Sequence, residues 1–225
     1  MSSLPTDPAP VWVVVVAAGT GSRFGGAKQY TSLGGRRVLD HSLLTARSVA
    51  DGVVVVVPPE RAADEEPAAD VVTAGGATRS ESVRAGLAVV PDDAAVVLVH
   101  DAARPLADRD LFRMVTDAVL AGADAVVPVV GVIDTIIDTD GNPVDRDRLA
   151  AVQTPQGFDA EILRQVHRTA PEATDDAGLV TAAGGRVRRV GGRRWNLKIT
   201  EAEDLPVMEA LLRESDDITT VGETT

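Results

Sequence analysis

Two basic residues give the glycine-rich segment 17–30, AAGTGSRFGGAKQY, the clearest capacity for chemistry in the chain. Arg23 and Lys28 lie five positions apart, so both cations can reach one triphosphate from a flexible loop. The small residues around them would let backbone N–H groups approach phosphate oxygens. Two common motifs are absent, because Phe24 replaces the third glycine of GxGxxG and Ala27 takes the place of the Walker A lysine. The segment therefore predicts anion binding by a less common loop, with a solvated surface loop as the open alternative.

An acidic and a basic residue follow the apolar run 94–99. Asp101 stands at the end of this predicted strand, where a carboxylate can hold Mg²⁺ against phosphates. Arg104, three residues on, can bind an anionic substrate. For Asp101 the alternative is a cap on the next turn, and His100 is interpreted as structural because the sequence offers it no evident partner.

A third segment, 73–84, places glycines before a predicted helix and leaves backbone amides for a ligand, with Thr78 or Ser80 as the helix cap. An ordinary strand-to-helix turn is nearly as good an interpretation of this segment.

Two residues further along the chain receive structural interpretations from local sequence alone. Thr174 is predicted to cap a later helix, and Lys198 is predicted to lie in solvent at the end of a strand.

Short β-branched runs predict the strands that must position these groups, and continuous runs of this kind are typical of a parallel sheet buried on both faces. The predicted strands cover residues 11–17, 53–57, 94–99, 125–130 and 186–190. The predicted helices cover residues 38–50, 80–88, 108–121, 160–170, 174–183 and 201–213. Their alternation predicts an α/β fold with a mostly parallel, doubly wound sheet, whose ligands lie at the carboxyl ends of the strands. One domain, 11–213, is expected between disordered tails at 1–10 and 214–225.

One segment interrupts this alternation. Residues 134–144, DTIIDTDGNPV, predict a β-hairpin that turns at Asp140-Gly141, within an arm of about residues 132–148. An isolated hairpin is marginally stable in water, so a second subunit is expected to cover it. Packing of the arm on its own domain is the alternative.

Composition narrows the function classes. The 225 residues carry 22 Lys and Arg against 34 Asp and Glu, a net charge of −12, and only 3% are aromatic. Nucleic-acid binding is therefore not expected. No cysteine is present, which excludes disulfides and thiolate zinc sites. No apolar run is long enough to span a membrane and no signal-like start is evident, so a soluble cytoplasmic protein is expected.

The order of several motifs resembles one known family. AAGTGSRF, AKQY, GGATRSESVRAGL, VHDAARP, VDRDRLAAVQTPQGF, ATDDAG and NLKIT together resemble 2-C-methyl-D-erythritol 4-phosphate cytidylyltransferases over about residues 11–212. The resemblance implies a Rossmann-like nucleotidyltransferase fold, the substrates CTP and methylerythritol 4-phosphate, and Mg²⁺ as cofactor. It also implies a homodimer in which the arm crosses to the partner subunit.

The same resemblance implies roles for individual residues. Arg23 and Lys28 would stabilise charge on the α-phosphate, Asp101 would face the metal and the nucleotide, and Arg146 and Lys198 would position the acceptor. The acceptor site would be lined by Arg104, Thr135, Thr154 and Thr174. The cytidine would be held by Ala17, Ala18, Gly19, Gly76, Ala77 and Ser82.

Three positions or segments depart from the family pattern. Ala27 stands where the family usually has proline, Ala77 stands where it often has an acidic or polar residue, and the arm is short. The alternatives to this function are a cytidylyltransferase for ribitol 5-phosphate or another polyol phosphate, and a non-catalytic nucleotide-binding regulator on the same scaffold. An NAD-dependent oxidoreductase is disfavoured by the broken glycine fingerprint.

Overall fold

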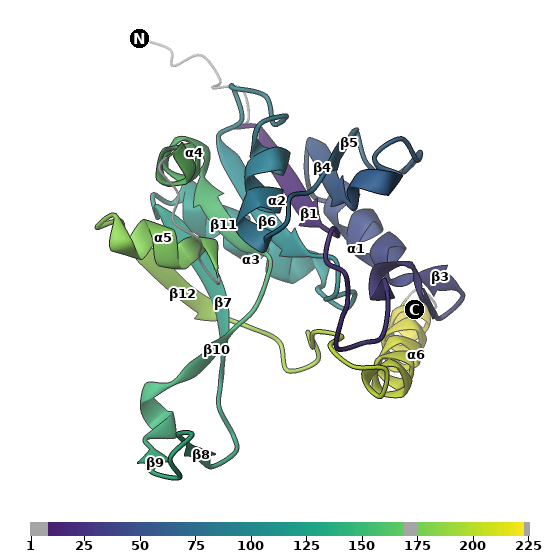
Figure 1. Cartoon of the computed structure of the whole chain (residues 1–225), viewed down its shortest axis with the longest axis vertical. Helices are drawn as coiled ribbons and strands as arrows, with labels where there is room; N and C mark the ends of the chain where they lie inside the picture. The colour runs from purple at the N-terminus through teal and green to yellow at the C-terminus, as the bar shows by residue number, and fades with distance from the viewer. Residues whose placement is uncertain (1–8, 169–174, 223–225) are drawn as a thin grey trace.

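The computed structural model describes residues 9–168 and 175–222, and it consists of one eight-stranded sheet with helices on both faces (Figure 1). The strand order is β10-β7-β11-β6-β1-β4-β5, and β12 pairs with β7. The strands are β1 (Val11–Val16), β4 (Gly52–Val57), β5 (Val71–Ala74), β6 (Val96–Asp101), β7 (Ala125–Gly131), β10 (Ala150–Val152), β11 (Gln156–Asp159) and β12 (Val187–Gly191). The predicted mostly parallel, doubly wound fold is confirmed.

The helices lie close to their predicted positions. They are α1 (Val38–Arg47), α2 (Arg79–Leu87), α3 (Arg109–Leu120), α4 (Ala160–Arg168), α5 (Asp176–Ala182) and α6 (Asp204–Gly222). Thr78 caps α2 as predicted, because its side chain accepts a hydrogen bond from the Glu81 N–H at 3.1 Å. The N-cap of α5 is Asp175 rather than the predicted Thr174, which lies outside the described residues.

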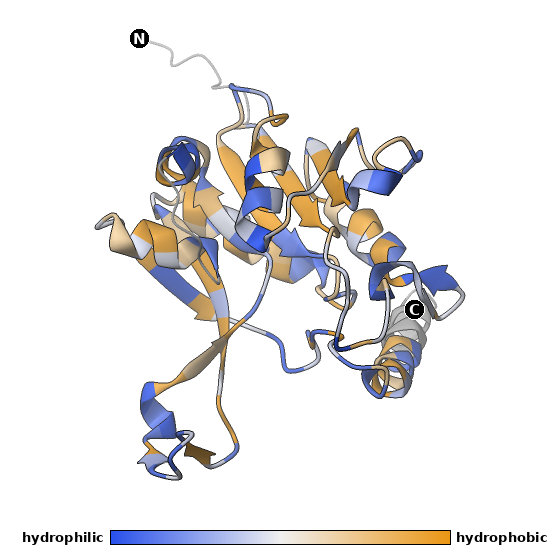
Figure 2. Ribbon diagram, viewed as in Figure 1, coloured by the Kyte–Doolittle hydropathy of each residue, from blue (hydrophilic) through white to orange (hydrophobic). Residues whose placement is uncertain are grey.

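The valine runs form strands because both faces of the sheet are covered. Along β1, Val13 and Val15 are buried with Leu39 of α1 and Phe112 of α3, whereas Val14 is buried on the other face. That second face is covered by apolar residues of α2, α4 and α5. Figure 2 shows the resulting hydrophobic sheet between helices of mixed character. Continuous apolar strands are what burial on two faces requires.

One central strand was not predicted. β11 lies between β6 and β7 and runs antiparallel to both. It contains Gly157, at which a Cβ atom would lie 2.5 Å from Val115 of α3 and 2.9 Å from Leu98 of β6. The strand therefore brings α3 close to the sheet, although its four residues lack the β-branched run that identified the other strands.

The two ends of the chain differ from the prediction in different ways. The expected N-terminal tail, 1–10, lies almost entirely outside the described residues. At the other end, α6 continues past Arg213 to Gly222, where a disordered tail was predicted. No Gly or Pro interrupts residues 207–221, and Pro206 stands in the first turn, where its missing N–H is not needed. None of the helices in the described part of the chain has the length and apolar character that a membrane span requires.

The predicted arm is present and extends away from the sheet (Figure 1). Two short strands, β8 (Ile136–Ile137) and β9 (Pro143–Val144), pair antiparallel, and Gly141 has φ +89° in the turn between them. The side chain of Asp138 accepts the N–H groups of Asp140 and Asn142 at 3.0 and 2.8 Å and so fixes the turn. Ile133 and Ile137 are 62% and 59% exposed, so the arm does not bury its apolar residues on its own domain.

Candidate active site

A cavity of about 910 Å³ opens where the carboxyl ends of β1, β4, β5 and β6 meet. Parallel strands place their following loops at one edge of the sheet, so segments far apart in the sequence converge there. The predicted site residues that line this cavity are Ala17, Ala18, Gly19, Arg23, Lys28, Gly76, Ala77, Ser82, Asp101 and Lys198.

The glycine-rich loop after β1 is fixed by a buried side chain. The amide group of Gln29, only 4% exposed, donates to the carbonyl oxygens of Ala17 at 2.7 Å and Gly19 at 3.2 Å. Gly21 has φ +65°, and a Cβ atom there would collide with the carbonyl oxygen of Gly26. These constraints close the loop into the turn that presents Arg23 to the cavity.

Three cations gather at the open side of the cavity. The ammonium group of Lys28 donates to the carbonyl oxygen of Ile199, beside Lys198. Burial lowers the pKa of Lys28, and the charges of Lys198 and Arg23 lower it further. A cluster of three cations in one cavity is suited to a polyphosphate ligand.

The loop before α2 forms another wall. The Ala77 N–H donates to the Glu81 carboxylate at 2.6 Å, and the Ser82 hydroxyl donates to the Thr78 carbonyl at 2.9 Å. These two donors are therefore already engaged within the chain. At Gly76 a Cβ atom would lie 2.3 Å from Glu81, so the close approach of backbone and helix requires glycine.

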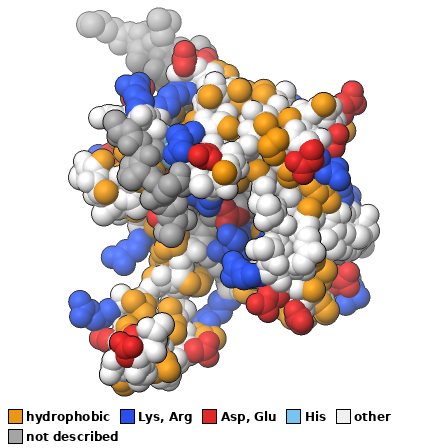
Figure 3. Space-filling model, in the orientation of Figure 1, with side chains coloured by type: hydrophobic (Ala, Val, Ile, Leu, Met, Phe, Trp, Pro, Cys, Tyr) orange, Lys and Arg blue, Asp and Glu red, His pale blue; other side chains and the backbone are white. Residues whose placement is uncertain are grey.

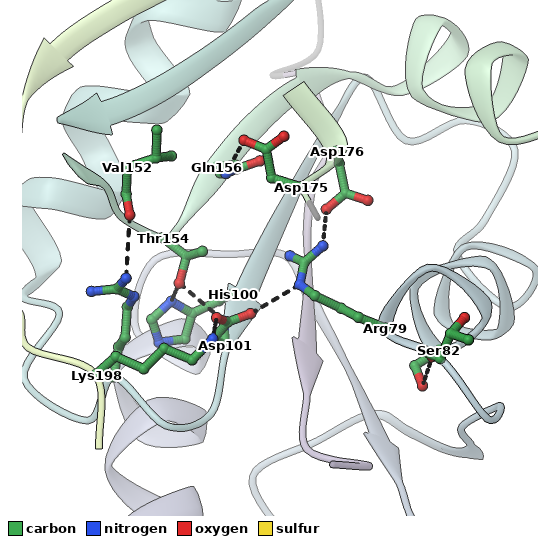
Figure 4. Close-up of polar contacts among 12 residues, drawn as sticks. Arg79, Ser82, His100, Asp101, Val152, Thr154, Gln156, Asp175, Asp176 and Lys198 are labelled. Atoms are coloured by element: carbon green, nitrogen blue, oxygen red, sulfur yellow. Dashed lines mark hydrogen bonds and ion pairs between the residues drawn. The ribbon is translucent and has the colours of Figure 1, made fainter. Parts of the chain in front are cut away.

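Asp101 occupies the centre of the site, at the end of β6 (Figure 4). Its carboxylate is 2.6 Å from the Lys198 ammonium group and 3.3 Å from the Arg79 guanidinium group. Burial opposes ionisation, but the charges of Arg79 and Lys198 outweigh it and hold the pKa of Asp101 well below its usual range. The Asp101 N–H also donates to the Thr154 hydroxyl at 3.0 Å.

His100 is structural, as predicted from the sequence. It is fully buried, stacks against Phe112 with ring centroids 5.0 Å apart, and its Nδ1 lies 3.1 Å from the Thr154 hydroxyl. Burial lowers its pKa to about 4, so the imidazole is neutral at pH 7. Thr154 thereby links two consecutive residues of β6 to the connection between β10 and β11.

The residues around Asp101 fit a magnesium ion that a nucleotide brings with it. Mg²⁺ in such sites is typically held by one or two carboxylates together with substrate phosphates and water. Asp101 is ionised and lines the cavity. Among the described residues, no group of three or more His, Cys, Asp or Glu could hold a metal ion by itself. The remaining ligands would therefore come from phosphate oxygens and water.

Four other predicted residues do not line this cavity, namely Arg104, Thr135, Arg146 and Thr154. Arg104 donates to the carbonyl oxygens of Asn196 at 2.7 Å and Val152 at 3.3 Å. Thr135 and Arg146 are exposed on the arm, and Thr174 lies outside the described residues. A single chain thus brings together the residues predicted to bind the nucleotide and leaves part of the predicted acceptor site apart from them.

Sequence reasoning missed two residues that organise the site. Gln29 stands next to Lys28 in the AKQY motif, and Arg79 stands in GGATRSESVRAGL, but neither had a predicted role. Arg79 lies between Asp101 and Asp176, whose carboxylate is 2.8 Å from its Nη1 (Figure 4). The sequence carried a weak signal for Arg79, a basic residue at the first position of a helix, where the helix dipole disfavours a cation.

Comparisons with known proteins agree on one family. A family model described as 2-C-methyl-D-erythritol 4-phosphate cytidylyltransferase matches residues 11–214. A relative of that name from Frankia casuarinae is 44% identical over 95% of this chain and 85% of its own length. Another, from Rhodococcus jostii, is 45% identical over 91% of this chain and 96% of its own. The crystal structure of the enzyme of that name from Thermus thermophilus is similar with a TM-score of 0.79 and 39% identity, over 91% of this chain and 99% of that one.

Proposed function

The chain belongs to the 2-C-methyl-D-erythritol 4-phosphate cytidylyltransferase family, and from this premise we propose how its residues transfer CMP from CTP to that acceptor. The products are 4-diphosphocytidyl-2-C-methyl-D-erythritol and pyrophosphate, within non-mevalonate isoprenoid biosynthesis. One observation carries the proposal, namely that Arg23, Lys28 and Lys198 meet the ionised Asp101 in one cavity.

Catalysis in this site is mainly electrostatic. A phosphate monoester has a second pKa of about 6, so at pH 7 the acceptor is already mostly ionised and no general base is needed. The remaining barrier comes from bringing two anions together and from charge that develops around the α-phosphorus. Arg23 and Lys28 would bind the oxygens on which that charge develops and hold the triphosphate in line with the acceptor.

Asp101 would hold the Mg²⁺ ion, which when bound neutralises part of the triphosphate charge. Lys198, which is paired with Asp101 in the structure, would bind the acceptor phosphate. The loop of Gly76, Ala77 and Ser82, which lines the cavity, would hold the cytidine.

The acceptor site would be completed by a second subunit. Arg146 and Thr135 are exposed on an arm that extends from its own domain, and hydrophobic side chains are exposed on that arm too (Figure 3). A homodimer in which each arm reaches the partner's cavity would bury those residues and add Arg146 to the cations already there. Arg104, Thr154 and Thr174 would contribute to the acceptor site from the domain itself.

We also propose that the enzyme works in the cytoplasm.

The test is pyrophosphate release by the purified protein with Mg²⁺, CTP and methylerythritol 4-phosphate. Ribitol 5-phosphate replaces the acceptor in one control, and ATP, GTP and UTP replace CTP in others. We expect release only with CTP and methylerythritol 4-phosphate together, and none in EDTA. Release with CTP and ribitol 5-phosphate but not with methylerythritol 4-phosphate would contradict the proposed acceptor. The absence of release from a folded sample in every combination would contradict the proposed catalytic activity.

A further inference from the structure

Both carboxylate oxygens of Asp101 are held by cations, and the two cations are anchored differently. Oδ2 lies 2.6 Å from Lys198 Nζ, and Oδ1 lies 3.3 Å from Arg79 Nε. The Lys198 side chain is 41% exposed and comes from a segment outside helices and strands. The Arg79 side chain is 24% exposed and comes from the first turn of α2. Lys198 is therefore the cation that is freer to leave when ligands bind.

Arg79 is held from its far side by a buried carboxylate. Its Nη1 lies 2.8 Å from Asp176 Oδ2, and the Asp176 side chain is 1% exposed (Figure 4). The other oxygen, Oδ1, lies 3.1 Å from Nε2 of His167, which is itself buried in α4. Asp176 thus has both oxygens engaged inside the protein and serves as a fixed support for the guanidinium group.

Asp176 does not line the cavity, whereas Arg79 and Asp101 do. If Asp176 lost its charge, Asp101 would be the one charged carboxylate left beside Arg79 among the described residues. The guanidinium group could then rotate and bind both carboxylate oxygens of Asp101. In the structure Arg79 contacts only Oδ1 of Asp101. Departure of Lys198 would then open Oδ2 to the cavity while Oδ1 stays fixed.

We propose that Arg79 is a positioning residue that fixes Asp101 for metal binding, and that Asp176 positions Arg79 in turn. The inference rests on the proposed function, because it assigns Asp101 to Mg²⁺. It predicts that Asp176 affects magnesium-dependent nucleotide binding although it does not reach the cavity. Partners of metal ligands typically change metal affinity or activity by about 10- to 100-fold when they are replaced.

The first experiment measures CTP affinity by calorimetry, with Mg²⁺ and with EDTA, in the absence of acceptor. Asp176→Asn keeps the side-chain shape and removes the charge. We expect it to weaken CTP binding in Mg²⁺ by about tenfold or more and to leave binding in EDTA within about threefold. Equal affinities of variant and wild type in Mg²⁺ would overturn the inference, and so would an equal loss in both conditions.

Two further variants separate positioning from a general loss of stability. In the wild-type background, Arg79→Gln should weaken CTP binding in Mg²⁺. In the Asp101→Asn background, the same substitution should weaken binding by less than about a further threefold, because the effects of coupled residues are not additive. The same loss in both backgrounds would mean that Arg79 acts independently of Asp101. Should Arg79→Gln not fold, Arg79→Lys keeps the charge without the fork and is expected to show a smaller loss of the same kind.

The matched control is Arg37→Gln. Arg37 also bridges two carboxylates, those of Asp40 and Glu66, but does not line the cavity. We expect a lower unfolding temperature with unchanged magnesium-dependent CTP binding. A magnesium-specific loss in this variant too would overturn the inference. Because calorimetry needs no turnover, absence of pyrophosphate release by the wild type would contradict the proposed function without deciding the role of Arg79.

Discussion

At the centre of the cavity Asp101 pairs with cations from distant segments, whereas on the arm the exposed Arg146 donates to the nearby carbonyl oxygen of Ile133. Asp101 is held by Lys198 and Arg79, and Lys28 donates to a backbone carbonyl. On the arm, Arg146 is exposed, and Ile133 and Ile137 expose more than half of their surface. The comparison indicates that one chain brings together the residues proposed to bind the nucleotide, whereas the proposal assigns completion of the acceptor site to a partner subunit.

The largest effect is expected from the cavity. Lys28→Ala should lower turnover by about 10²- to 10³-fold, because one cation that meets developing charge is lost from a site sheltered from water. The unfolding temperature should stay close to that of the wild type. The measurement is kcat for pyrophosphate release, with Arg113→Ala, an exposed cation of α3, as the control. Wild-type turnover in Lys28→Ala would remove this residue from the mechanism.

A smaller effect is expected from the arm. Arg146→Ala should raise KM for methylerythritol 4-phosphate by about 10- to 100-fold, since hydrogen bonds to charged groups contribute about 1.5 to 3 kcal/mol. KM for CTP should change little. A parallel rise in both constants would argue against a role confined to the acceptor.

Mixing the two impaired variants, at an acceptor concentration well below KM, tests whether the arm serves the partner's cavity. In a random dimer of Lys28→Ala and Arg146→Ala subunits, one of the two sites in each mixed dimer carries both intact residues. Activity should recover to about a quarter of the wild-type value after subunit exchange. Recovery would fail if each arm served the cavity of its own chain.

The apolar surface of the arm offers a weaker perturbation. Ile137→Asp should raise the dimer dissociation constant by at least about tenfold, because burying such a side chain contributes about 1.5 to 3 kcal/mol. Sedimentation velocity across a concentration series gives this constant. Leu120→Asp is the control, since Leu120 is also exposed, at 52%, but lies on α3. An unchanged dimer in Ile137→Asp would place the interface elsewhere.

The smallest expected effect is on the pH profile. The pKa of Lys28 lies below that of an ordinary lysine, so its charge is present at low pH and is lost as the pH rises through this lowered value. Turnover should therefore decline on the alkaline side earlier than an unperturbed lysine would allow. Lys28→Arg, which stays charged, should extend activity to higher pH. If the wild type and Lys28→Arg lost turnover over the same alkaline pH range, a group other than Lys28 would be responsible for the decline.

How far the sequence predicts each region depends on how local the determining interactions are. The strands β1 and β4 could be predicted because each is a run of consecutive valines, which indicates a strand buried on both faces. The antiparallel β11 was missed, since its place depends on its two neighbouring strands rather than on its own residues. The turn at Asp140-Gly141 was predicted, because local chemistry determines it.

The candidate site shows the same division. Arg23, Lys28 and Asp101 could be identified because each stands in a motif beside a predicted strand. The contacts of Arg79 could not be identified from the sequence. Its partner Asp176 lies 97 positions away, and the contact between them depends on how α5 packs. The pairing of Lys198 with Asp101 spans the same separation, and the local prediction of a solvated lysine was wrong in that respect.

The amide of Gln29 has a consequence for the entropy of binding. Because it ties down the carbonyl groups of Ala17 and Gly19, that stretch of backbone loses its conformational freedom when the chain folds. A nucleotide that meets the loop then finds it already ordered, and none of its interaction energy is consumed in ordering that stretch. The backbone NMR order parameters of residues 17–19 should accordingly be as high as those of β1 before any ligand is present.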